Sequence, residues 1–226
     1  ELMQREFVME GLREVNARVG IDDKTIVLHG DVDEICRPEF ARNVRPKRPA
    51  RPTLLPDNTP DLGFVSFNMR GFFFAVDWLH PDIWGGTVAG TLEQVMALGQ
   101  WPFQKMRNTR NWNVSSIHDS GWHFSWMGGT DAALAKLGAF CHPEVSDRVL
   151  VGLSTDRYRK EGMHLDGRRM APVEVDEDWP AFVYERRCPA EWFRPRDERP
   201  TFVDDSVANV PAGDVIFEGD FSGYKP

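Results

Sequence analysis

Two aspartates separated by one residue are the first feature of the sequence that could support chemistry. Asp31 and Asp33 belong to the run 31–34 (DVDE), which follows the apolar run 25–28 (TIVL) closely. In an extended backbone, side chains at positions i and i+2 lie on one face, so both carboxylates could bind one hard cation such as Mn²⁺ or Mg²⁺. Such an ion can neutralise a diphosphate leaving group. For the pair alone, a plain solvated turn remains an alternative.

A second group of candidate residues lies in the run 120–131 (SGWHFSWMGGTD). Trp122 and Trp126 alternate with His123, as on a strand with two distinct faces. A flat aromatic ring can stack on the apolar face of a sugar, so we predict that these three residues contribute to substrate binding. Core packing of the rings is the alternative, and Trp78 and Trp84 are further candidates for the same aromatic wall.

The glycine pair that follows could bring the backbone close to a ligand. Gly128 and Gly129 precede Asp131, which falls in the first turn of a predicted helix, where the helix dipole favours an ionised carboxylate. We therefore predict Asp131 as a catalytic general base, with helix capping as the alternative. His142, near the end of that helix, is a candidate third metal ligand, although a lone histidine is more often structural.

These residues need elements that position them. Apolar residues recur at helical spacing from Met3 to Val19 and end at Gly20, which predicts a helix. The run 25–28 then predicts a buried, central strand whose carboxyl end carries Asp31 and Asp33, as in open α/β sheets. Further strands are predicted within 63–78, 101–106, 114–117 and 122–126, and helices at 92–98, where Thr91 and Gln94 form a capping box, and at 131–140.

The composition excludes some classes of protein. The chain has 226 residues, of which 41% are hydrophobic, and a formal net charge of -8. It therefore lacks the excess of Lys and Arg over acidic residues that is typical of a nucleic-acid-binding protein. The three cysteines form no CxxC pair, which argues against a zinc ribbon. No signal peptide or membrane anchor is visible, and because the chain begins at Glu1 without Met we expect upstream sequence to have been removed.

Two runs resemble a known family. The segments 31–39 (DVDEICRPE) and 121–144 (GWHFSWMGGTDAALAKLGAFCHPE) are similar to motifs of glycosyltransferase family 17, which includes the β-1,4-mannosyl-glycoprotein 4-β-N-acetylglucosaminyltransferase. The resemblance covers roughly residues 4–165. It implies a GT-A-like α/β fold, an open mixed sheet flanked by helices. In this chain we expect that fold to lack its N-terminal nucleotide-binding strand.

The resemblance also implies a function. The family's metal motif corresponds to Asp31 and Asp33, with Glu34 adjoining as a substrate-binding candidate, and its histidine corresponds to His142. The expected activity is metal-dependent, inverting transfer of N-acetylglucosamine from UDP to a glycan hydroxyl by a catalytic domain over residues 1–200. Residues 201–226 are expected to form a short β-rich tail.

Other functions and the location of the chain stay open. The alternatives are a metal-dependent nucleotidyl- or phosphotransferase and a non-catalytic carbohydrate-binding protein. The expected partners are a nucleotide-sugar donor and a glycan acceptor, without nucleic acid. We expect a soluble chain, cytoplasmic if microbial and from the Golgi lumen if a eukaryotic fragment.

Overall fold

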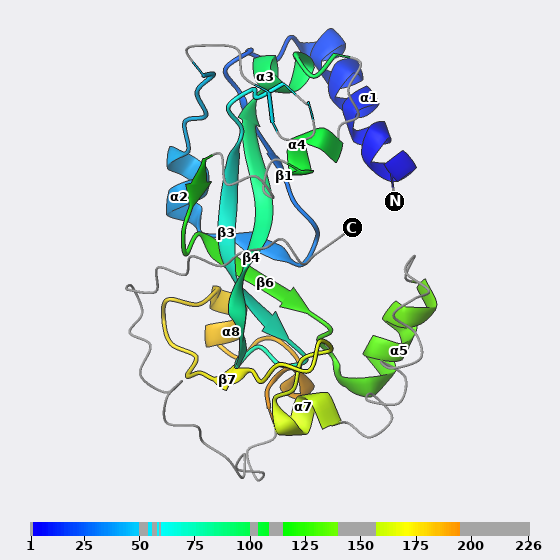
Figure 1. Cartoon of the computed structure of the whole chain (residues 1–226), viewed down its shortest axis with the longest axis vertical. Coiled ribbons are helices and arrows are strands. Elements are labelled where there is room, and N and C mark those ends of the chain that lie inside the picture. The colour runs from blue at the N-terminus through cyan, green and yellow to red at the C-terminus, as the bar shows by residue number, and fades with distance from the viewer. Residues whose placement is uncertain are drawn as a thin grey trace. The chain divides into compact units, whose positions relative to one another are not determined.

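A computed structural model describes most of the chain (Figure 1). The described residues are 2–49, 54–55, 58, 60–99, 104–108, 115–139 and 157–194. The expected tail 201–226 and His142 lie outside them. The chain divides into two compact units, which are considered separately below. The first contains residues 1–71 and 82–124, and the second contains residues 72–81 and 125–226.

The strands form one seven-stranded mixed sheet, so the coarse α/β prediction is confirmed. The order of the sheet is β1-β4-β3-β6-β2, with β5 beside β3 and β7 beside β4. The pairs β1·β4, β2·β6 and β4·β7 are antiparallel, whereas β3·β5 is parallel. The strands are β1 (Ile26–His29), β2 (Glu34–Cys36), β3 (Val65–Phe73), β4 (Trp78–Thr91), β5 (Ser116–Ile117), β6 (Gly121–Ser125) and β7 (Ala171–Pro172).

The strand before the DVDE run is not the buried central strand expected from the sequence. β1 stands at one end of the strand order and pairs with β4. Its residues are only partly buried, and Leu28 is exposed. A strand at the edge of a sheet pairs with a neighbouring strand on one side only. A short apolar run can therefore form such a strand without being enclosed on both sides. The expected placement of Asp31 and Asp33 beyond a central strand is therefore wrong.

Helices accompany the strands in both units. The predicted N-terminal helix is α1 (Leu2–Val19), and α3 (Leu92–Met96) has the predicted capping box between Thr91 and Gln94. Residues 104–106, expected in a strand, instead begin a short helix, α4 (Gln104–Asn108). The other helices among the described residues are α2 (Pro38–Asn43), α5 (Gly129–Ala139), α7 (Arg157–Glu161), α8 (Ala181–Tyr184) and the 3-10 turn η3 (Ala190–Trp192).

The core of the first unit holds the elements that carry the candidate site. One cluster of buried side chains joins α1, α3 and α4 to the sheet, and its members are Met9, Leu62, Phe64, Val88, Val95, Leu98 and Met106. A second cluster is formed by Val44, Val65, Phe67, Met69 and Ala89, with Trp84 packed against it. None of the described helices is both long and apolar enough to cross a membrane.

Candidate functional site

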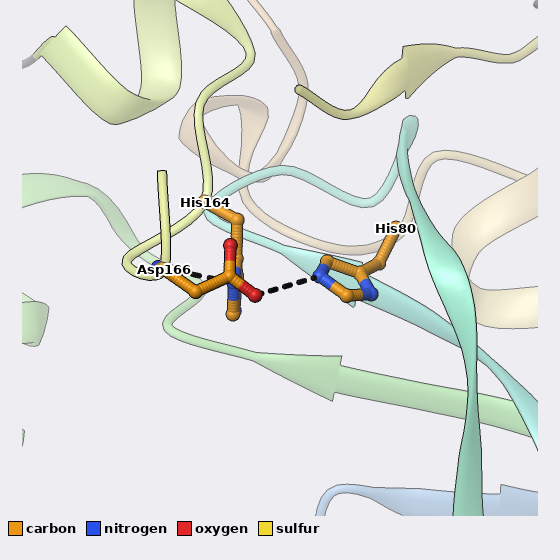
Figure 2. A group of neighbouring side chains, drawn as sticks. All are labelled: His80, His164 and Asp166. Carbon is orange, nitrogen blue, oxygen red and sulfur yellow. Dashed lines mark hydrogen bonds and ion pairs between the residues drawn. The ribbon is translucent and has the colours of Figure 1, made fainter. Parts of the chain in front are cut away.

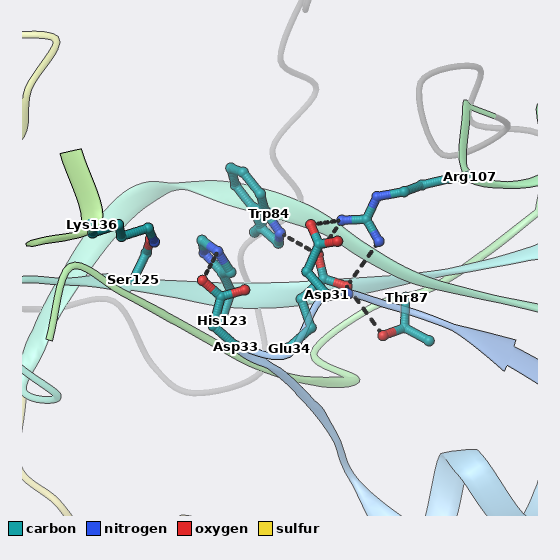
Figure 3. Close-up of polar contacts among 9 residues, drawn as sticks. All are labelled: Asp31, Asp33, Glu34, Trp84, Thr87, Arg107, His123, Ser125 and Lys136. Carbon is teal, nitrogen blue, oxygen red and sulfur yellow. Dashed lines mark hydrogen bonds and ion pairs between the residues drawn. The ribbon is translucent and has the colours of Figure 1, made fainter. Parts of the chain in front are cut away.

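The DVDE run folds as a tight turn and not as extended backbone. The amide of Glu34 donates a hydrogen bond to the carbonyl oxygen of Asp31 at 3.0 Å, and the amide of Asp31 donates to Glu34 Oε2, also at 3.0 Å. Val32 at the tip is fully exposed. The expectation that Asp31 and Asp33 share one face through extended i, i+2 spacing is therefore wrong, because the turn directs them to different neighbours (Figure 3).

A buried arginine holds this turn. Arg107, from α4, has a side chain that is 1% exposed, and its Nη2 lies 2.6 Å from Asp31 Oδ2 and 2.6 Å from Glu34 Oε1. Its Nη1 also donates to Glu34 Oε2 at 3.3 Å. The planar guanidinium can bond several carboxylate oxygens at once. One residue of α4 therefore fixes both ends of the acidic turn.

Glu34 is fully enclosed, with no side-chain exposure. The indole of Trp84 donates to its Oε1 at 2.9 Å, and the hydroxyl of Thr87 lies 3.3 Å from its Oε2. Burial raises the pKa of Glu34, but its hydrogen bonds and the charge of Arg107 outweigh burial and hold the pKa below its usual value. Glu34, a predicted substrate-binding residue, is thus a buried support of the turn that does not reach solvent.

Asp33 faces a different group. Its Oδ2 lies 3.6 Å from Nε2 of His123, whose side chain is 5% exposed. The register of β2 and β6 places His123 directly opposite Glu34, so both side chains come from one cross-strand pair. The imidazole of His123 also stacks on Trp84, with ring centroids 3.9 Å apart. His123 thus lies at the predicted site, between Asp33 and the indole (Figure 3).

The turn presents two partly exposed carboxylates above a buried ion pair. The side chain of Asp31 is 41% exposed and that of Asp33 is 26% exposed. Asp31, Asp33 and Glu34 give the run three carboxylates, of which the guanidinium of Arg107 contacts those of Asp31 and Glu34, so carboxylates outnumber the guanidinium. Oxygen ligands and net negative charge suit a hard divalent cation such as Mn²⁺ or Mg²⁺.

The predicted aromatic wall is mostly core. Trp78, Trp122 and Trp126 are 2%, 3% and 7% exposed, so their rings offer little surface to a sugar. The guanidinium of Arg37 covers the ring of Trp122 at 4.3 Å. For Trp122 the packing alternative is the one observed, because every residue of β6 is buried and the strand has no exposed face. Trp126, directly after β6, is buried as well. Trp84 remains partly exposed.

The glycine turn and Asp131 lie in the second unit. Gly128 and Gly129 have φ values of +93° and +74°, which side-chain-bearing residues rarely adopt. They lead into α5, which begins at Gly129, and Asp131 is exposed in its first turn, as predicted. In the same unit, Lys136 donates to Ser125 Oγ at 2.9 Å and lies 5.0 Å from the ring centre of Trp126.

The sequence interpretation missed a cluster in the second unit. His80 on β4 lies beside His164 and Asp166 on the loop between α7 and β7 (Figure 2). Burial raises the pKa of Asp166, but hydrogen bonds from Arg168 and His164 more than offset it and keep the pKa well below its usual value. The spacing of His164 and Asp166 was a local signal for two ligands on one turn, whereas His80 is 84 residues away from His164 and carries no such signal.

Comparisons of the chain with protein-family models, with curated proteins and with solved structures gave no significant match.

Proposed function

We propose that this chain is a metal-dependent glycosyltransferase that uses a nucleotide sugar, with UDP-N-acetylglucosamine as the expected donor. The observation that supports this most is the buried Arg107 beneath the acidic turn. A turn that served only to reverse the chain could place its carboxylates in water. Here Glu34 and Arg107 are both removed from solvent, at a substantial desolvation cost, and together they fix the backbone that carries Asp31 and Asp33.

Asp31 and Asp33 would hold the Mn²⁺ or Mg²⁺ ion, which neutralises the diphosphate as it leaves. Glu34 and Arg107 position them. Asp131, exposed in the first turn of α5, is the proposed base that takes the proton of the acceptor hydroxyl. These assignments to the donor and acceptor rest on the resemblance of the motifs and on the chemistry of the side chains.

An enzyme fits the burial of the aromatic residues better than a carbohydrate-binding module does. Such a module would present several rings to solvent for stacking, whereas Trp122 and Trp126 are buried. Trp84 is the partly exposed ring next to the acidic turn, where it could contact a substrate.

The test is UDP release and sugar transfer from labelled UDP-N-acetylglucosamine, measured with and without Mn²⁺. We expect Asp33→Asn to abolish metal-dependent turnover and Asp131→Asn to lower kcat by about two orders of magnitude or more with little change in donor affinity. Asp23→Asn, an exposed aspartate before β1, is the matched control and should retain activity. Metal-independent turnover that Asp33→Asn leaves unchanged would refute the proposal, and transfer of a nucleotidyl or phosphoryl group would favour the alternative enzyme class.

A further inference from the structure

The second unit contains three potential metal ligands from two separate segments. His80 comes from β4, and His164 and Asp166 come from the loop that leads to β7. One ligand atom of each residue lies within 4.8 Å of the others, and this is the one such group of three or more among the described residues. The carboxylate of Asp166 lies beside both imidazoles (Figure 2).

The separations within the cluster fit a single small ion. Asp166 Oδ1 is 3.0 Å from His164 Nδ1, and Asp166 Oδ2 is 3.7 Å from His80 Nε2. Two ligands of a tetrahedral Zn²⁺ ion, each bound at about 2.0–2.1 Å, are about 3.3 Å apart. The two observed separations involve different oxygens of Asp166 and lie on either side of that value, and Arg168 donates to Oδ2. Side-chain rotation that brings one Asp166 oxygen to both imidazoles would therefore complete the site.

The loop that carries two of the ligands is held by its own hydrogen bonds. The amide of His164 donates to the carbonyl oxygen of Arg168 at 2.8 Å, and the amide of Gly167 donates to that of His164 at 2.9 Å. Met163 and Arg169 form a bridge at the base of the loop. The ligands are therefore placed before any ion binds, which lowers the entropic cost of forming a site.

Apolar packing shields one side of the cluster. The ring of Phe73 makes edge contacts with both imidazoles, at centroid distances of 5.3 Å to His80 and 4.4 Å to His164. The side chain of His80 is 6% exposed and that of His164 is 15% exposed, whereas that of Asp166 is 36% exposed. Solvent therefore reaches the cluster mainly at the carboxylate.

We propose that His80, His164 and Asp166 bind one Zn²⁺ ion, with the fourth position taken by water or an anionic ligand from solvent. Two imidazoles and one carboxylate form a mixed nitrogen and oxygen ligand set, which suits Zn²⁺ better than Mg²⁺ or Ca²⁺. The ligand set differs from the carboxylates of Asp31 and Asp33, so the two sites should differ in ion preference. The site is independent of the proposed glycosyltransferase activity.

The test uses the whole chain, stripped of metal with a chelator and titrated with ZnCl₂ in a calorimeter. His164→Ala and Asp166→Asn should each weaken zinc binding about 100-fold or more, since loss of residues that only support a ligand already costs about 10–100-fold. His118→Ala, an exposed histidine outside the cluster, should bind as the unaltered chain does. Circular dichroism of the metal-free variants checks that each is folded. If either His164→Ala or Asp166→Asn fails to fold, the other variant still provides the test.

Two further measurements separate this site from other sources of zinc binding. Zinc should raise the melting temperature of the unaltered chain and of His118→Ala but not of His164→Ala, because an ion that binds only the folded state stabilises it. Co²⁺ bound in place of Zn²⁺ should show no thiolate charge-transfer band. No binding by the unaltered chain, equal binding by His164→Ala, or a thiolate band would each overturn the proposal.

Discussion

The indole of Trp84 and the imidazole of His123 lie face to face, with ring centroids 3.9 Å apart and planes inclined by 4°. The same indole donates its Nε1–H to Glu34 at 2.9 Å, while His123 Nε2 lies 3.6 Å from Asp33. Trp84 therefore connects the buried carboxylate of Glu34 to the imidazole of His123, which lies beside the partly exposed carboxylate of Asp33.

The hydrogen bond from Trp84 can be separated from its stacking. Trp84→Phe keeps an aromatic face for His123 but removes the donor to Glu34, so we expect a loss of about 1.5–3 kcal/mol of unfolding free energy. Urea denaturation of Trp84→Phe, Glu34→Gln and the double variant measures the coupling between the two residues. Additive effects would contradict a direct interaction.

Arg107 should be more sensitive to replacement than its position on a short helix suggests. Arg107→Ala leaves the buried charge of Glu34 without its counter-charge and should cost about 3–5 kcal/mol of unfolding free energy. Arg107→Lys retains the charge but cannot bond Asp31 and Glu34 as a planar fork, so its stability should lie in between. Chemical denaturation of the three proteins orders them, and equal stability of the Lys variant and the unaltered chain would show that geometry is unimportant.

The lowered pKa of Glu34 predicts a specific dependence of stability on pH. Relative to the ordinary value of 4.5, a lowered pKa in the folded state makes ionised Glu34 stabilising above about pH 4.5. That contribution is lost as the pH falls through 4.5 toward the folded-state pKa. Glu34→Gln should thus be less stable than the unaltered chain at pH 7, and this gap in unfolding free energy should narrow as the pH falls below 4.5. Denaturant midpoints between pH 7 and pH 3 test this, and a gap that is constant or widens would contradict it.

Gly30 is required because other atoms occupy the space of a side chain. A Cβ there would lie 2.2 Å from Thr87 Oγ1 and 2.9 Å from Glu34 Oε2. Gly30→Ala should cost about 1–3 kcal/mol through overpacking, and Thr87→Ala should restore part of that loss. Gly11→Ala in α1 is the matched control, since nothing lies within 4 Å of its Cβ position, and it should stabilise by about 0.5–1 kcal/mol. Thermal melts of Gly30→Ala, Thr87→Ala, the double variant of these two and Gly11→Ala provide the comparison.

Local signals in the sequence predicted several elements correctly. The apolar spacing before Gly20 predicted α1, the pair Thr91 and Gln94 predicted the start of α3, and Asp131 lies in the first turn of α5 as expected. Each of these features depends on residues within a few positions of one another. The turn at residues 31–34 was only the alternative to the extended pair of Asp31 and Asp33 that we expected, and that expectation was wrong.

Long-range packing explains what the sequence did not predict. The strand β4 was not predicted, because Pro81 and the glycines of β4 are residues typical of loops. A Cβ at Gly86 would, however, lie 2.6 Å from Met69 Sδ, and one at Gly90 would lie 2.6 Å from the ring of Phe64. These glycines make room for large neighbours within the first unit. Likewise, Arg107 is 73 residues from Glu34, so nothing near the DVDE run indicates its counter-charge.

The tip of the acidic turn and its base should diverge at different rates during evolution. Val32 projects into water and touches little, so random substitutions there would pass selection easily. Gly30 and Glu34 have fixed neighbours and should change rarely, and Arg107 should change only together with Glu34. A search for distant relatives could require Gly30, Glu34 and a matching arginine and leave position 32 open. Such a search would match the expected pattern of substitutions better than a search for the aspartate pair alone.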